Sequence, residues 1–156
     1  MKIIFLDIDG VLNAKDSRSR CCGYRGMDDK RVKILAKIVE ETKAEIVLTS
    51  TWKEYWQKTD KHRQGDMANY LDKKLERYNL FIYDKTRDSE NKVYFSRGES
   101  ILNYLQKNLA KKFVIIDDIQ FDYDGCGLTD KYVKTSKREG LTEELAQKAI
   151  AILNGK

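Results

Sequence analysis

The chain contains a single histidine, three cysteines and no proline among its 156 residues. Because His62 is the sole histidine, the usual Ser-His-Asp and Cys-His routes to nucleophilic catalysis are excluded. The odd number of cysteines, with Cys21 and Cys22 adjacent, argues against a disulfide framework. The absence of a CxxC pair argues against a zinc site. An enzyme with this sequence would therefore have to work with carboxylates, hydroxyl groups, lysine and arginine.

No long hydrophobic run opens the sequence. The apolar stretch from Ile3 to Leu6 is too short for a signal peptide or a membrane span. We therefore expect a cytoplasmic protein without a membrane partner. No repeat or low-complexity tract marks a boundary, so residues 1–156 are expected to form one domain with a single core. The net charge of +5 mildly favours an anionic partner.

Short apolar runs alternate with stretches of helical periodicity. Strands are predicted at residues 2–6, 45–49, 80–83, 113–116 and 132–133, and a loop at 13–26. Helices are predicted from residue 28 or 29, in pieces within 52–78 with a break at Gly65, after a Ser96–Glu99 capping box with an apolar face reaching Leu109, and after Thr142. This alternation predicts an α/β fold, a three-layer domain with a parallel, Rossmann-like sheet.

Three of the predicted strands are followed by polar residues. The first ends in Asp7-Ile8-Asp9, the second in Thr49-Ser50 and a later one in Asp117-Asp118. In a parallel sheet the carboxyl ends of the strands lie on one edge, where ligands bind. We therefore expect these side chains to meet in one crevice.

The residue types at this edge suit phosphoryl transfer. Asp7 can attack phosphorus and form an aspartyl-phosphate. Asp9 can protonate the leaving oxygen and later activate water. A hydroxyl group from Thr49 or Ser50 can hold a phosphate oxygen, and Arg97 at a helix start can neutralise the shared charge.

Carboxylates packed this closely need a counter-cation, and Mg²⁺ prefers oxygen ligands. The expected Mg²⁺ ligands are Asp7, the backbone carbonyl of Ile8 or Asp9, and Asp118, with Asp117 completing the site. Mg²⁺ is thus the expected cofactor.

Simpler interpretations exist for each feature. A lone Asp-x-Asp-Gly also fits a turn or a calcium-binding loop, and Thr49 and Ser50 can instead cap a helix. Packing is favoured over base stacking for three aromatic residues: Trp52, Tyr55 and Trp56. A solvated loop is favoured over a substrate-facing cationic lid for four basic residues: Lys15, Arg18, Arg20 and Arg25.

The four motifs together resemble the haloacid dehalogenase (HAD) superfamily. Its motifs correspond, in order, to residues 7–10, residues 46–50, Arg97, and Asp117-Asp118 with Asp122. Residues 48–53, 97–101, 114–118 and 140–142 are similar to the HAD domain first described in Swiss-army-knife RNA-repair proteins, a relative of polynucleotide phosphatases. Arg97 stands where lysine is commoner, which keeps the charge but changes its reach.

The resemblance implies a Mg²⁺-dependent phosphomonoesterase with a minimal cap and an open site, acting on nucleotides or phosphorylated nucleic-acid ends. No obligate protein partner is expected. Two alternatives remain: a phosphatase for small metabolites, and a non-catalytic signalling module that binds phosphate or Mg²⁺. A dehalogenase is disfavoured because such enzymes need neither the second aspartate nor a metal.

Overall fold

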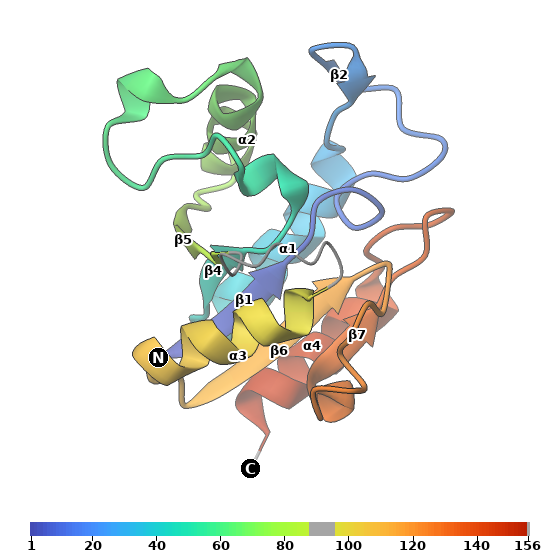
Figure 1. The fold of residues 1–156 in the computed structure, drawn as a ribbon. Coiled ribbons are helices and arrows are strands. Elements are labelled where there is room, and N and C mark those ends of the chain that lie inside the picture. Colours follow the sequence, from blue (N-terminus) through green and yellow to red (C-terminus); the bar gives the residue numbers. More distant parts are fainter. Residues whose placement is uncertain (88–95, 156) are drawn as a thin grey trace.

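The computed structural model describes residues 1–87 and 96–155 and is built around one parallel sheet (Figure 1). The strand order is β5-β4-β1-β6-β7, and neighbouring strands are parallel throughout. The strands are β1 (Lys2–Leu6), β4 (Glu45–Leu48), β5 (Ile82–Lys85), β6 (Lys112–Asp117) and β7 (Tyr132–Lys134). This arrangement confirms the predicted Rossmann-like α/β fold.

Helices cover both faces of the sheet, which gives three layers. The helices are α1 (Asp29–Thr42), α2 (Asp66–Glu76), α3 (Arg97–Lys107) and α4 (Glu143–Asn154). Ile4 and Leu6 of β1 belong to the core that includes α1, α2 and α4, whereas Ile3 and Phe5 belong to the core under α3. A strand covered on both faces needs apolar residues at every position, which explains the unbroken run in β1.

Three parts of the predicted secondary structure differ from the structure by more than one residue. Within the predicted 13–26 loop, β2 (Arg20–Cys21) and β3 (Tyr24–Arg25) form a small antiparallel hairpin. Its turn, Cys22-Gly23, has positive φ at both residues, as a type I′ hairpin turn requires, but strands this short carry no alternation to detect.

The third strand and the third helix also differ from prediction. The β5 strand begins at Ile82, because Leu80 packs into the core below α2 instead of pairing with β4. Helix α3 ends at Lys107, so Leu109 lies outside it and is 88% exposed. The break at Gly65 and the cap at Thr142 are confirmed, because Gly65 precedes α2 and the Thr142 hydroxyl accepts from Leu145 N–H.

Two segments lie over one end of the sheet: the β2–β3 hairpin, residues 20–25, and residues 51–76, which we call the second insertion. The β2–β3 hairpin and the segment containing α2 project to the same side of the molecule, away from both termini (Figure 1). Two short 3₁₀ helices, Thr51–Lys53 and Lys61–Arg63, lie in the second insertion. Neither insertion is large, in agreement with the predicted minimal cap. In residues 1–87 and 96–155 no helix is long and apolar enough to cross a membrane.

Candidate active site

Strand register brings the predicted residues to one level of the sheet. Leu6 of β1 pairs with Leu48 of β4 and with Ile116 of β6. The next residue of each strand therefore lies at the carboxyl edge, where Asp7 N–H donates to the Ile116 carbonyl and Thr49 N–H to the Leu6 carbonyl. Asp7 thus lies between Thr49 and Asp117 on the edge of the sheet where the sequence predicted that these residues meet.

Three carboxylates gather at this edge. One oxygen from each of Asp7, Asp117 and Asp118 lies within 4.8 Å of the others. Burial, and then the charge of Asp117, raise the pKa of Asp7 well above its usual range, although Arg97 opposes the shift. Burial also raises the pKa of Asp118. Charged carboxylates this close repel one another, so the three together form a donor set that fits a hard divalent cation such as Mg²⁺.

Arg97 forms ion pairs with two carboxylates of this cluster. Its Nη1 lies 3.2 Å from Asp7 Oδ1 and 2.8 Å from Asp117 Oδ2. Burial alone would lower the pKa of Arg97, but Asp7 and Asp117 raise it above its ordinary value. The guanidinium also lies 4.3 Å from the centre of the Phe121 ring. Arg97 therefore stays charged and fixed beside Asp7.

The start of α3 places Arg97, but not through the predicted capping box. Ser96 precedes the helix without accepting a capping hydrogen bond through its side chain. The Asp122 carboxylate accepts from Gly98 N–H instead, at 2.7 Å. Asp122, a member of the fourth motif, thus supports the helix that carries Arg97.

Asp117 is the most enclosed of the three carboxylates. Besides Arg97, its Oδ2 accepts from the Tyr123 hydroxyl at 2.8 Å, and its Oδ1 accepts from Ile119 N–H at 3.1 Å. Asp118 is only partly buried, and it lines a cleft beside the cluster. Asp118 is therefore the more available of the pair for a ligand.

Asp9 is exposed and lies outside the carboxylate cluster. Its Oδ1 accepts from Asn13 Nδ2 at 2.9 Å, and its Oδ2 accepts from Trp52 Nε1 at 3.1 Å. The Asn13 side-chain oxygen in turn accepts from Gly10 N–H. Trp52 was expected only to pack, and Asn13 was not among the expected site residues. The one available signal was that an asparagine soon after a glycine turn often bonds to backbone amides.

The two hydroxyl groups after β4 have different environments. Ser50 Oγ accepts from Trp52 N–H at 3.2 Å and so caps the short helix that follows. Thr49 Oγ1 is buried and has no hydrogen-bond partner among the residues described. A buried hydroxyl without a partner is costly, so Thr49 is the one left to serve a ligand.

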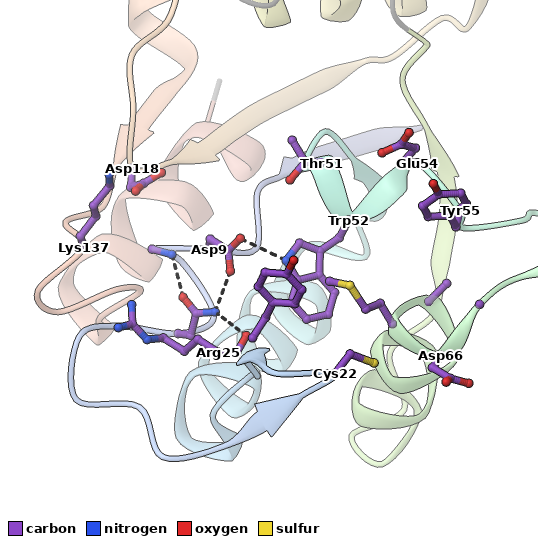
Figure 2. Close-up of a pocket in the computed structure, with 16 residues that line it drawn as sticks. Asp9, Cys22, Arg25, Thr51, Trp52, Glu54, Tyr55, Asp66, Asp118 and Lys137 are labelled. Atoms are coloured by element: carbon purple, nitrogen blue, oxygen red, sulfur yellow. Dashed lines mark hydrogen bonds between the residues drawn. The ribbon is translucent and has the colours of Figure 1, made fainter.

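A cleft of about 690 Å³ opens between the hairpin and the second insertion, and Asp118 is the member of the carboxylate cluster that lines it. Asp118 and Lys137 lie at one end, Tyr55, Glu54 and Asp66 at the other, and Asp9 and Trp52 between them (Figure 2). The volume is typical of a small-molecule site.

The four basic residues and three aromatic residues for which two interpretations were open differ in whether they line this cleft. Of the four basic residues weighed as a cationic lid, Arg25 lines the cleft, whereas Arg20 binds the carbonyls of Ser17 and Ser19. Packing is confirmed for Trp52 and Trp56, which are 6% and 1% exposed. It was wrong for Tyr55, which is 66% exposed because it stands at the cleft mouth.

A parallel α/β sheet with a carboxylate cluster at its carboxyl edge is compatible with the haloacid dehalogenase superfamily. Residues 3–146 match the model of the HAD domain in Swiss Army Knife RNA repair proteins, and the chain belongs to this family. A comparison with curated proteins found no match. Family membership implies a phosphatase-type hydrolase with a phosphorylated substrate.

Proposed function

We propose that the chain is a Mg²⁺-dependent phosphomonoesterase that works through an aspartyl-phosphate on Asp7. The observation that carries this proposal is the position of Asp7 between the Arg97 guanidinium, 3.2 Å away, and the carboxylates of Asp117 and Asp118. A nucleophilic carboxylate needs neighbours that bind the incoming phosphate and leave at least one oxygen of the carboxylate unblocked. The Arg97 ion pair involves Oδ1 of Asp7 and leaves Oδ2 outside it.

In the first step, an Asp7 oxygen bonds to phosphorus as the ester oxygen departs. Asp9 gives its proton to that oxygen, so the leaving group departs as a neutral alcohol. Asn13 and Trp52 fix both oxygens of Asp9 and hold the acid at the cleft. Arg97 and the Thr49 hydroxyl bind the phosphoryl oxygens as their charge shifts.

In the second step, the Asp9 carboxylate takes a proton from water as the water oxygen attacks phosphorus. The bond between Asp7 and phosphorus breaks, which releases phosphate and restores the carboxylate. Asp9 is exposed at the cleft, so water can reach it. One residue thus serves as acid and then as base.

The metal ligands proposed are Asp7, Asp118 and the backbone carbonyl of Asp9, with Asp117 in support. The carbonyl of Ile8, the other candidate, already accepts from Val11 N–H and Leu12 N–H. Bound Mg²⁺ would neutralise the carboxylates and stabilise charge on the phosphoryl oxygens. We propose nucleotides or phosphorylated nucleic-acid ends as substrates, because the family description names RNA repair and the cleft is open.

Turnover of p-nitrophenyl phosphate tests the catalytic proposal. We expect activity with Mg²⁺, loss with EDTA, and a loss of at least about a thousandfold in Asp7→Asn. Asp130→Asn, an exposed aspartate far along the chain, is the matched control and should stay active. Full activity in Asp7→Asn would overturn the proposal. Turnover of small sugar phosphates without turnover of nucleotides or of 3′- or 5′-phosphorylated oligonucleotides would overturn the substrate class.

A further inference from the structure

Two exposed tyrosines line the candidate active-site cleft from different elements. Tyr24 belongs to β3 of the hairpin, and Tyr55 follows the first 3₁₀ helix of the second insertion. Each is 66% exposed, whereas most aromatic side chains within residues 1–87 and 96–155 are buried or half-buried. A single exposed aromatic residue needs no explanation, but two that face one cleft from separate segments suggest a ligand.

We propose that Tyr24 and Tyr55 form a stacking site for a planar heteroaromatic ring carried by the leaving group. The substrate class is then a phosphate ester of a nucleoside, either free or at the end of a nucleic acid. This inference rests on the proposed phosphatase function, which would place the phosphate at Asp7. It goes further by assigning residues that select the rest of the substrate.

The polarity of the cleft supports this orientation. Asp118 and Lys137 lie at one end, and Tyr55 lies at the other with Trp52 in between (Figure 2). A molecule with an anionic group and a flat ring at opposite ends matches this order. Stacking on aromatic side chains is a common way to hold bases, because every base has a flat face.

The acidic residues near Tyr55 restrict which chemical groups a ligand can carry at that end of the cleft. Glu54 and Asp66 line the cleft near Tyr55 and are exposed (Figure 2). Their negative charge repels a second phosphate there and disfavours an aliphatic chain. They can accept hydrogen bonds from ring amino groups or from sugar hydroxyl groups. A sugar phosphate that carries a base places no second phosphate at this end, and its base and sugar can donate these hydrogen bonds.

Binding to the Asp7→Asn variant tests the site without turnover. Adenosine 5′-monophosphate and ribose 5-phosphate form a matched pair that differs only in the base. We expect calorimetry with Mg²⁺ to give at least about tenfold tighter binding of the nucleotide. Tyr24→Ala and Tyr55→Ala, made in the same background, should each remove most of that preference and leave ribose 5-phosphate binding unchanged.

Conservative variants and one control separate stacking from folding. Tyr24→Phe and Tyr55→Phe keep the ring and should keep the preference. Tyr83→Ala removes an exposed tyrosine of β5 that does not line the cleft, and should also keep it. Equal binding of the two ligands by the unsubstituted cleft, or an unchanged preference in both alanine variants, would overturn the inference.

The outcomes also distinguish this inference from the proposed function. A base preference in a protein that hydrolyses no phosphate ester would uphold the ring site and reject the phosphatase. Turnover without any base preference would do the reverse. A 5′-phosphorylated oligonucleotide then identifies the source of the base: tighter binding than the mononucleotide assigns a nucleic-acid end, and equal or weaker binding assigns a free nucleotide.

Discussion

Gly10 shows how closely the backbone approaches the carboxylate cluster. Its φ is +78°, and a Cβ placed there would lie 2.3 Å from Asp118 Oδ2. The loop after β1 is also held by the residue that follows β7, because the Thr135 hydroxyl donates to the Gly10 carbonyl. Any side chain at this position must therefore displace Asp118.

We expect Gly10→Ala to weaken Mg²⁺ binding at least about tenfold, because displacing Asp118 removes one ligand. Isothermal titration with Mg²⁺ measures the effect. Gly23→Ala is a matched control: Gly23 also has positive φ, at +83°, but a Cβ there meets nothing within 4 Å. Both variants carry backbone strain, so equal loss of Mg²⁺ binding in the two would contradict the role assigned to the contact with Asp118.

At the residue scale, position relative to a strand end was the predictive signal. Asp7, Asp117 and Asp118 could be placed together because parallel strands end on one edge. Asn13 and Trp52 could not, because their contacts with Asp9 depend on how two loops fold over that edge. The choice between Thr49 and Ser50 likewise needed the three-dimensional hydrogen bonds.

At the element scale, the start of α3 links packing to the site. The Asp122 carboxylate bonds Gly98 N–H, one residue after Arg97. A Cβ at Gly98 would meet Asp122 Oδ1 at 3.0 Å, so the two residues fit closely. Asp122 acts on the site through the helix and is a positioning residue for Arg97.

We expect Asp122→Ala to lower the free energy of unfolding by about 1 kcal/mol, as loss of a helix cap does, and to lower kcat/KM about tenfold. Thr142→Ala removes the cap of α4, which carries none of the residues assigned to the site. It should cost similar stability and leave kcat/KM unchanged. Denaturant unfolding and steady-state kinetics measure both. Equal kinetic effects in the two variants would contradict a specific link to Arg97.

The elements that the sequence predicted well are those with long periodic or fully apolar patterns. β1, β6, α1 and α4 are of this kind. The two strands are covered on both faces of the sheet, and each of the two helices packs one apolar face into the core. The β2–β3 hairpin and the start of β5 were missed because two-residue strands and an edge strand with an irregular register leave little pattern.

At the scale of the whole molecule, the carboxylate cluster lowers the free energy of unfolding when no metal is bound. Asp7 is buried beside Asp117, and its pKa is raised well above the usual range. An acid with a raised pKa in the folded state binds protons more tightly there than in the unfolded chain. The metal-free protein therefore loses stability as the pH rises from the unfolded carboxyl pKa, about 4, through the folded one.

We expect Asp7→Asn to raise the metal-free free energy of unfolding by about 1 kcal/mol at neutral pH, because Arg97 keeps Asp117 as a partner. The gain should shrink towards about pH 4, where the native carboxyl is protonated. Thermal unfolding in EDTA across this pH range measures it. Adding Mg²⁺ should raise the Tm of the unsubstituted protein more than that of the variant. A variant less stable than its parent in EDTA at neutral pH would contradict this prediction.

The overall architecture followed from alternating strand and helix patterns, because few topologies satisfy them. The placement of the hairpin and the second insertion over Asp9 did not follow, since neither has a core of its own to predict. Their side chains shape the cleft, and this is where the proposed substrate selection by Tyr24 and Tyr55 resides.

The most direct test of the central claim is to locate the phosphoryl group during turnover. Asp9→Asn should slow hydrolysis of the intermediate, since it removes the base, while p-nitrophenyl phosphate still phosphorylates the enzyme because its leaving group needs little acid help. Acid quenching followed by peptide mass spectrometry should then find one phosphoryl group on Asp7. A phosphoryl group on another residue, or none in a variant that still forms nitrophenol, would contradict the account.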